Sequence, residues 1–449
     1  MSQKYQPNNE ISMFLSKRFY IAGLVAIMLF VTGYIFPDVF IAGQICFVLL
    51  VVATITDCFL LWRRKKTVDA ERYCAPRFSN GDDNDVRLVI ENDYPFKVRM
   101  AIIDEIPVVF QRRDILFKTT IRAGQREVLH YKLRPTQRGE YDFGHILLYI
   151  TTVIGLAIRR IKCARPVNVA VFPSYIMMHQ YEFLAIHHNL QELGIKKIRR
   201  IGHNTEFESI KEYIKGDDYR TINWKASARR HFPMVNIYQD ERSQQIYNII
   251  DKGRIMQNAF RGMTLLDYAI NASLVLSFIA IRKDDKAGLA TFAEKFETFI
   301  PAGKQVSQMQ QILEALYRQQ TTFGESDYSS LYVHLNKYIN KRSLLVIYTN
   351  FDTIIGMERQ LDYLRQLARR HVVLVVFFED TELKAFAAQR PASMEGYYQQ
   401  VITDKFIFEK QHVIAKLRQH GIYSLLTEPD KLSVNIINKY LEMKARGTI

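Results

Sequence analysis

Cysteine is scarce in this sequence and stands in no paired spacing. The four cysteines are spread along the chain, and two of them lie inside apolar stretches: Cys46, Cys58, Cys74 and Cys163. A disulfide framework or a structural zinc site needs closely spaced pairs such as C-x-x-C, and none is present. The pattern therefore excludes both classes and is most typical of a protein exposed to a reducing compartment.

Several catalytic motifs are also absent. The sequence has no G-x-x-x-x-G-K-[ST] phosphate loop, so the chain is not itself a P-loop ATPase. It has no G-x-S-x-G elbow, no H-E-x-x-H zinc motif and no G-x-G-x-x-G dinucleotide fingerprint. No repeat of 20 to 50 residues is visible either. These absences exclude the enzyme classes that such motifs identify, and they favour a binding function.

Acidic residues are outnumbered by basic ones. The 449 residues contain 46 Asp and Glu against 61 Lys and Arg, for a net charge of +15. The length predicts two to four domains, and 48% hydrophobic residues exclude global disorder. A basic chain is typical of a nucleic-acid binder or of a protein lying against an anionic membrane. More than half of the excess lies in residues 63–172, directly after an apolar region, which favours the membrane over nucleic acid.

Two long uncharged or nearly uncharged runs occupy the first sixty residues. The first covers Phe19–Phe36 and the second Val39–Trp62, with Pro37-Asp38 between them. About 20 apolar residues suffice to cross the hydrocarbon core, so residues 19–62 are predicted to form a transmembrane helical hairpin. The alternatives are a signal peptide, for which no cleavage site separates the runs, and a hairpin buried in a protein core.

The charges that flank the hairpin predict its orientation. Lys17 and Arg18 precede the first run, and Arg63-Arg64-Lys65-Lys66 follows the second. Because positive flanks stay in the cytoplasm, both termini and all later domains are expected there, with residues 1–18 as a cytoplasmic tail. Membrane lipid is thus an expected partner.

Residues 67–172 are rich in β-branched and aromatic residues. Short runs alternate with turn signals, and the predicted strands are Asp85–Glu91, Phe96–Ile103, Arg126–Leu133, His145–Thr151 and Val167–Phe172. Strands of this length and spacing favour an antiparallel β-sandwich. Nothing in this segment has catalytic spacing, so a spacer or docking role is expected.

The densest motif lies in the connecting segment, residues 173–242. It contains a short stretch with Phe207, Ile210 and Ile214 that is predicted to be helical and to end at Gly216. Asp217 or Asp218 is expected to cap a second helix with Ile222, Ala226 and Arg229 at helical spacing, and Trp224 is expected to bury its ring. The candidate partner-binding residues are Gly216, Asp217, Asp218, Tyr219, Arg220, Trp224, Ala228 and Arg229. The alternative is purely structural, a capped helix with an internal Asp–Arg pair.

This motif closely resembles the hallmark of the bacterial domain-of-unknown-function 58 family. The resemblance rests on G-D-D-Y-R-x-I-N-W-K-A-S-A-R, with E-F-E upstream and Asp240-Glu241-Arg242 downstream. It implies an inner-membrane protein whose C-terminal part has a von Willebrand factor A-like fold. It further implies a MoxR-type AAA+ ATPase as partner and membrane or envelope protein maturation as setting. It implies no reaction.

Residues 243–449 alternate strands with helices. The apolar segments Gln245–Ile250, Ser343–Tyr348 and Val372–Phe378 are typical of strands covered on both faces. Thr264–Arg282 is predicted to be an amphipathic helix. The order predicts a doubly wound α/β domain, with any site at the C-terminal ends of its strands.

Three polar residues follow predicted strands or their loops: Asp251, Ser326 and Asp352. In a von Willebrand factor A-like domain such residues hold Mg²⁺, but the usual D-x-S-x-S loop here reads D-K-G-R-I. Gly253 and Ile255 supply no hydroxyl oxygen, whereas hard cations need about six oxygen ligands. No cofactor is therefore expected, although a degenerate Mg²⁺ site stays open, and Asp251 is expected to cap the following turn.

The residues favour a membrane-anchored interaction protein rather than an enzyme. The strand-end loops with Asp251, Ser326 and Asp352 would form a docking surface for the ATPase. The alternative is a hydrolase or metal-dependent enzyme that uses Asp217, Asp218 and Arg220, or the degenerate site at Asp251. Nucleic-acid binding rests on charge alone and is not expected.

Overall fold

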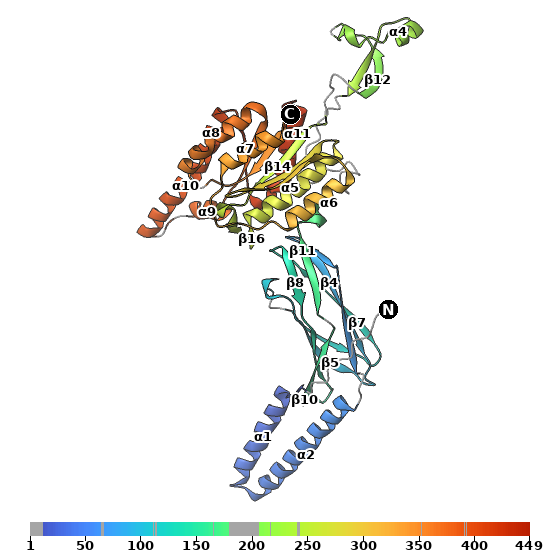
Figure 1. Cartoon of the computed structure of the whole chain (residues 1–449). Coiled ribbons are helices and arrows are strands. Elements are labelled where there is room, and N and C mark those ends of the chain that lie inside the picture. The colour runs from blue at the N-terminus through green and yellow to red at the C-terminus, as the bar shows by residue number, and fades with distance from the viewer. Residues whose placement is uncertain are drawn as a thin grey trace. The chain divides into compact units, whose positions relative to one another are not determined.

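The chain divides into two compact units, residues 1–172 and residues 173–449. The computed structural model in Figure 1 describes residues 12–63, 67–110, 112, 115–164, 166–178, 206–215, 217–239, 243–351, 353–389, 391 and 393–449. Each unit has its own hydrophobic core. The predicted sites Gly216 and Asp352 and the motif residues 240–242 lie outside the described residues.

The first unit begins with a helical hairpin. Helix α1 spans Lys17–Gly33 and helix α2 spans Pro37–Trp62, and the two pack against each other. Pro37 stands at the first position of α2, where its missing N–H costs nothing. Gly33 is required at the turn, because a Cβ there would lie 2.7 Å from the backbone of Phe40. Most apolar side chains of both helices are exposed in the structure.

The rest of the first unit consists of three sheets around one core. Their strand orders are β1-β10-β9-β5-β6, β2-β4-β7 and β3-β11-β8. The bounds are β1 Ser12–Leu15, β2 Val68–Cys74, β3 Arg77–Ser79, β4 Asn84–Asn92, β5 Val98–Asp104, β6 Leu116–Ile121, β7 Arg126–Leu133, β8 Gly139–Phe143, β9 Ile146–Thr151, β10 Ala157–Cys163 and β11 Val167–Phe172. Strands β4, β5, β9 and β10 alternate buried and more exposed residues, so one face of each packs on the shared core.

Strand β1 changes one expectation from the sequence. Ser12–Leu15 lies in the segment predicted to be a tail, yet it pairs antiparallel with β10, from Ser12 opposite Arg160 to Leu15 opposite Ala157. Because this pairing joins residues about 145 positions apart, no local pattern could reveal it. Both ends of the hairpin are thereby attached to the same β domain.

The second unit contains a mostly parallel six-stranded sheet in the order β18-β17-β14-β19-β20-β21. The strands are β14 Gln245–Asp251, β17 Lys286–Phe292, β18 Phe296–Gly303, β19 Leu344–Tyr348, β20 Val372–Phe378 and β21 Tyr423–Thr427. Only the edge strand β18 runs antiparallel to its neighbour. Two small antiparallel pairs accompany the sheet, β15 Ala259–Phe260 with β16 Met263–Thr264 and β12 Glu206–Glu212 with β13 Met234–Gln239.

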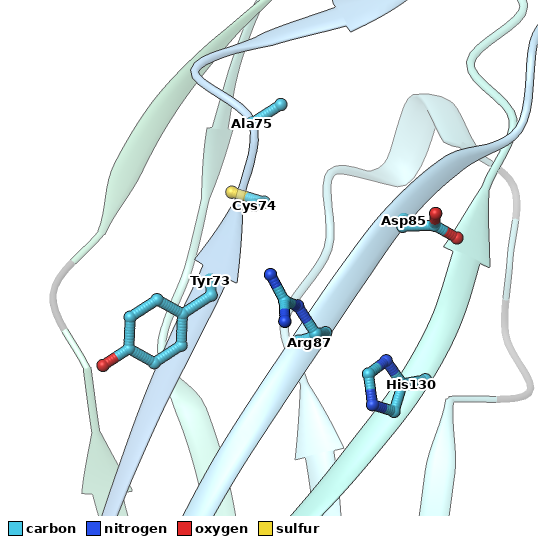
Figure 2. Close-up of a pocket in the computed structure, with 6 residues that line it drawn as sticks. All are labelled: Tyr73, Cys74, Ala75, Asp85, Arg87 and His130. Atoms are coloured by element: carbon cyan, nitrogen blue, oxygen red, sulfur yellow. The ribbon is translucent and has the colours of Figure 1, made fainter.

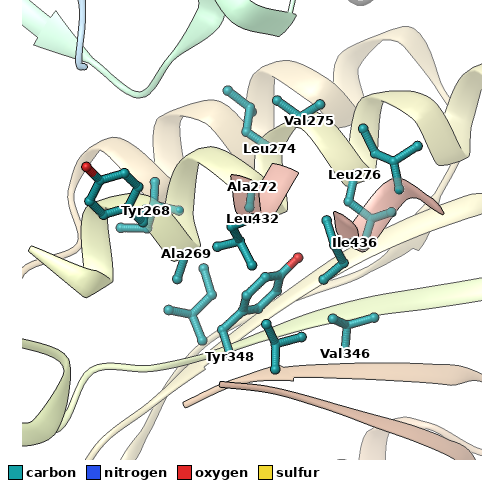
Figure 3. Close-up of a cluster of buried hydrophobic side chains, with 14 of the residues drawn as sticks. Tyr268, Ala269, Ala272, Leu274, Val275, Leu276, Val346, Tyr348, Leu432 and Ile436 are labelled. Carbon is teal, nitrogen blue, oxygen red and sulfur yellow. The ribbon is translucent and has the colours of Figure 1, made fainter. Parts of the chain in front are cut away.

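Helices cover both faces of this sheet. The helices that pack on the sheet are α5 Leu265–Arg282, α6 Val306–Tyr317, α7 Tyr328–Tyr338, α8 Ile354–Arg370, α10 Met394–Gln419 and α11 Leu432–Ala445. Of the other described helices in this unit, α9 Thr381–Ala387 contacts α10, and α4 Trp224–Arg230 lies between β12 and β13. One core joins the sheet to α5, α6 and α11, and the other joins it to α7, α8 and α10. Figure 3 shows Ala269 and Ala272 of α5 near Tyr348 of β19 and Leu432 of α11. The predicted amphipathic helix is therefore enclosed, since every residue from Leu265 to Ala280 is buried.

Candidate functional site

The hallmark segment forms a small β-hairpin arm, defined here as residues 206–239. Strands β12 and β13 pair antiparallel, with Lys211 opposite Val235 and Glu212 opposite Met234. The helix predicted to contain Phe207, Ile210 and Ile214 is wrong, because Glu206–Glu212 is strand β12. Its partner strand, about 25 residues later, decides the conformation, and pairing of that range overrides local helical spacing.

The two aspartates of the motif build the loop that follows β12. Asp217 accepts a hydrogen bond from Lys211 Nζ at 2.8 Å and another from the Ile214 N–H at 3.0 Å. Asp218 caps the short 3-10 turn Tyr219–Thr221 by accepting the Arg220 N–H at 3.0 Å. The prediction that one of these aspartates caps the helix with Ala226 and Arg229 is therefore wrong, because Asp218 caps only the 3-10 turn before it. The ion pair that involves Asp217 is with Lys211 rather than with an arginine.

The electrostatics of Asp217 follow from these bonds. The Lys211 ammonium and the Ile214 N–H hold the pKa of the Asp217 carboxyl below its ordinary value. A lowered folded-state pKa contributes stability above the unfolded pKa, and that contribution disappears as the pH falls through the folded value. The carboxylate is therefore a structural anion at neutral pH, which does not favour a role as a general acid.

Two polar residues that sequence reasoning passed over hold the second half of the loop. Asn223 caps helix α4 by accepting the Ala226 N–H at 3.0 Å, and its amide donates to Asn236 Oδ1 at 2.9 Å. The Ser227 hydroxyl accepts the Met234 N–H at 2.8 Å. An Asn directly before the helical run was the available signal for the cap.

Three aromatic side chains of the arm are exposed, by contrast. Trp224 is 75% exposed, which corrects the prediction that its ring is buried, and Tyr219 and Phe232 are 67% and 63% exposed. Ala228, Arg220 and Arg229 are also exposed, and the Arg220 guanidinium lies over the Tyr219 ring at 5.7 Å. The polar residues of the motif thus shape the loop, while its aromatic and basic residues form an accessible surface.

A second cluster lies where strand β14 ends. Asp251 is buried, and its carboxylate accepts the Gly253 N–H at 2.9 Å, the Thr349 hydroxyl at 2.7 Å and the Ser326 hydroxyl. The structure brings the predicted Asp251 and Ser326 together and shows that Asp251 caps the turn, as expected. Thr349, at the end of β19, was not singled out from the sequence, although its position after a buried strand matches that of Asp251.

Packing explains the glycine in the D-K-G-R-I loop. A Cβ at Gly253 would lie 2.1 Å from Ser326 Oγ and 3.1 Å from Asp251 Oδ1. The Ser326 hydroxyl occupies the space that a serine side chain at position 253 would need. Lys252 does not bring its charge to the cluster, because its ammonium pairs with Glu297.

The donor set at Asp251 is poor for a hard cation. The described residues supply one carboxylate and the hydroxyls of Ser326, Thr349 and Tyr328. The first two hydroxyls donate to Asp251 and the third donates to Thr349 Oγ1. Among the described residues no group of three or more His, Cys, Asp or Glu side chains could hold a metal ion. Burial raises the pKa of Asp251, with the hydrogen bonds from Ser326, Gly253 and Thr349 acting against it. The described residues therefore do not fit Mg²⁺, which takes about six oxygen ligands.

A third feature is a hollow of about 580 Å³ on the outer face of sheet β2-β4-β7 (Figure 2). It is lined by Tyr73, Cys74, Ala75, Asp85, Arg87 and His130. Arg87 lies between Tyr73 and His130 in the strand register. Burial raises the pKa of the Cys74 thiol, which keeps it protonated and opposes a nucleophilic role.

Comparison with known proteins places both the arm and the Asp251 cluster in one matched region. The model of the family described as "Protein of unknown function DUF58" matches residues 209–388. The "Uncharacterized protein YeaD" of Bacillus subtilis (strain 168) is 25% identical over 173 residues. That match covers 38% of this chain and 40% of the length of that protein.

Two solved structures are among those that align with parts of the chain. BatB from Bacteroides thetaiotaomicron is 10% identical, with a TM-score of 0.32, over 45% of this chain and 99% of that one. The CARDB domain of a Pyrococcus furiosus protein is 11% identical, with a TM-score of 0.16, over 24% of this chain and 93% of that one.

Proposed function

We propose that the protein is a membrane-anchored docking protein whose arm, residues 206–239, binds another protein. The supporting observation is the exposure of Tyr219, Trp224 and Phe232 on a loop in which Asp217, Asp218 and Asn223 accept hydrogen bonds from backbone N–H groups of the arm itself. Aromatic residues and arginine dominate the energetics of protein interfaces, and an exposed tryptophan leaves a large apolar surface in water. A covering partner would remove that cost.

The partner surface should be apolar with an acidic rim. Arg220, Lys225, Arg229 and Arg230 are exposed around Trp224, so acidic groups would complement them. By the resemblance drawn from the hallmark motif, the partner is a MoxR-type AAA+ ATPase, and the setting is membrane or envelope protein maturation. Asp251 is 3% exposed and would shape its loop rather than touch the partner.

Co-purification from detergent-solubilised membranes, with and without ATP, tests this proposal. The double variant Tyr219→Ala with Trp224→Ala should weaken recovery of the ATPase by more than about tenfold, because buried aromatic anchors each contribute about 2 kcal/mol or more. Tyr398→Ala in α10 is the matched control, since Tyr398 is 68% exposed and Tyr219 67%. Failure to recover any ATPase, or equal loss in the control, would contradict the proposal.

We infer that the α1–α2 hairpin spans the inner membrane and leaves the soluble domains in the cytoplasm. Helix α2 has 26 residues, about 39 Å, and α1 has 17 residues, about 26 Å, which bracket a hydrocarbon core of about 30 Å. Pairing of β1 with β10 favours both hairpin ends on one side, and the basic flanks favour the cytoplasmic side. A C-terminal alkaline phosphatase fusion should be inactive; an active fusion would contradict this topology.

The finer fold assignment belongs with this proposal. The shared core of the three β sheets favours a sandwich in residues 67–172. The parallel sheet, with helices on both faces and Asp251 at the end of its central strand β14, favours a von Willebrand factor A-like arrangement in residues 243–449. An experimental structure with Asp251 away from Ser326 and Thr349 would contradict the second assignment.

A further inference from the structure

The loop between β9 and β10, defined here as residues 152–156, is bound to both ends of the helical hairpin. On the α2 side, Asp57 is completely buried and accepts the N–H groups of Leu156 and Ala157, each at 2.8 Å, and the Thr152 hydroxyl. On the α1 side, Ser16 donates its hydroxyl to the Gly155 carbonyl and its N–H to the Leu156 carbonyl at 2.9 Å. The loop is therefore fixed where the hairpin meets the β domain.

The position of Asp57 along α2 gives the depth of this loop. Asp57 lies 20 residues after Pro37, and a helix of that length rises about 30 Å. That is about the thickness of the hydrocarbon core, so a hairpin that spans the membrane places Asp57 at its boundary. Strand β9 ends at Thr151, and strand β10 begins at Ala157. The loop between them therefore projects beyond the sheet, at the end where the helices attach.

The exposed tip of the loop is apolar and is flanked by arginines. Val153 is 68% exposed and Ile154 41%. Arg99 donates to the Val153 carbonyl at 2.8 Å, and Arg18 donates to the Ile154 carbonyl at 3.3 Å. A Cβ at Gly155 would lie 3.0 Å from Arg99 Nη2 and 3.4 Å from Arg18 Nη1, so both guanidinium groups lie close to this turn.

We propose that this loop is a third membrane-contacting element, which inserts Val153 and Ile154 beside the hairpin and places Arg18 and Arg99 at the level of the lipid phosphates. The inference rests on the proposed spanning hairpin. Apolar side chains gain by entering the acyl region, while arginine next to them pairs with phosphate oxygens. The hydrogen bonds to Asp57 then hold the loop at this depth. The β domain would then contact the bilayer directly, in addition to being connected to it through the hairpin.

Depth-dependent quenching tests the proposal on the full chain in nanodiscs of phosphatidylcholine and phosphatidylglycerol. A fluorescent label is placed at Val153→Cys, in a chain whose four native cysteines are replaced by alanine. Leu49→Cys, 63% exposed in α2, reports the hairpin, and Val128→Cys, 48% exposed in β7, is the matched control on the β domain. Nitroxides on lipid acyl chains should quench the labels at 153 and 49 at least twofold, and the label at 128 hardly at all.

The outcomes separate this inference from the proposed hairpin. Quenching at 49 without quenching at 153 overturns the loop insertion and leaves the hairpin intact. Absence of quenching at both positions overturns both. Because the cysteine-free chain could fail to fold, photoactivatable diazirine phosphatidylcholine provides a second measurement on the unaltered chain. Lipid adducts should map to residues 152–156 and not to residues 126–133, and the reverse distribution overturns the inference.

Discussion

Helices α2 and α5 have similar composition but very different surroundings. Within the described part of the chain, these two helices are long and apolar enough to cross a membrane. Only 6% of the most apolar window of α2 is buried, against 89% of that of α5. Length and apolarity alone therefore do not distinguish a membrane helix from the core helix of an α/β domain.

The polar side chains distinguish the two helices. In α2, Thr54 and Thr56 donate their hydroxyls to carbonyls of their own helix, an arrangement that needs no partner outside it. In α5, by contrast, Ser277 accepts a hydrogen bond from Asn248 on strand β14, and Asn271 accepts one from the Ser174 N–H. Polar groups in the middle of α5 thus bond to other elements, whereas in α2 such bonds are made by Asp57, near the end where the helix meets the β domain.

The largest expected effect comes from a charge placed in each helix. Leu276→Asp in α5 buries an unpaired carboxyl and should destabilise the α/β domain by about 4 kcal/mol or more. Leu49→Asp, at the middle of α2, should leave that domain folded and cost about 3 kcal/mol of membrane insertion. Limited trypsin digestion measures the first effect, and carbonate extraction of membranes measures the second. If Leu276→Asp released the protein from the membrane and left the α/β domain folded, α5 rather than α2 would be the membrane helix.

The contrast between these helices also marks how far sequence reasoning reaches. Strands β7, β11 and β20 form with the predicted bounds, because continuous or alternating apolar patterns are local signals. The two helices of the hairpin were also predicted, because their apolar runs are local signals. The enclosure of α5 was not, since the helices α6 and α11 that cover its second face come from distant segments.

The sites were predicted less completely than the fold, for a related reason. The sequence pointed to Asp251 and Ser326 from their places after strands, and the structure brings them into contact. Thr349 completes the cluster but is one polar residue among many at strand ends. In the arm, Trp224 was expected to be buried because tryptophan usually is, whereas its side chain is 75% exposed on the short helix α4.

The second prediction concerns Asp57, the carboxylate of α2 that accepts hydrogen bonds from the β9–β10 loop. Asp57→Ala removes the acceptor of the Leu156 and Ala157 N–H groups, and each unsatisfied donor costs about 1–3 kcal/mol. Hydrogen exchange at these two amides should accelerate by at least about tenfold. Asp38→Ala, in the first turn of α2, is the control and should leave both amides unchanged. Unchanged protection in Asp57→Ala would mean that the loop does not depend on the helix.

The third prediction concerns the loop that follows strand β14, the strand that α5 covers. Gly253→Ala places a Cβ against Ser326 Oγ and should cost about 1–3 kcal/mol. In Gly253→Ala combined with Ser326→Ala, the cost should fall at least about 1 kcal/mol below the sum of the single effects, because the clashing hydroxyl is gone. Pulse proteolysis in detergent measures all three variants. Additive costs would show that crowding by Ser326 is not what requires glycine here.

The smallest effects should come from the N-caps that start α5 and α1. Thr264 caps α5 by accepting the Asp267 N–H at 3.1 Å, and Ser16 caps α1 by accepting the Arg18 N–H at 3.2 Å. Replacing either by alanine should cost about 1 kcal/mol, while glycine at an N-cap costs only a few tenths. Thr264→Ala should lower the stability of the whole α/β domain, whereas Ser16→Ala should accelerate exchange only near the base of the hairpin.

Glycine variants separate the capping role from the second bond that Ser16 makes. The Thr264 hydroxyl bonds to the N–H and the carboxylate of Asp267, both within its own helix. The ordinary preference for glycine over alanine at an N-cap therefore applies, and Thr264→Gly should recover most of the loss seen with alanine. The Ser16 hydroxyl donates to the Gly155 carbonyl of the β9–β10 loop, and neither alanine nor glycine can replace that bond. Ser16→Gly should therefore remain nearly as perturbed as Ser16→Ala, measured by exchange at the Leu156 amide. Full recovery in Ser16→Gly would mean that this serine serves its own helix alone, as Thr264 does, and that the loop is held to the hairpin from the α2 side only.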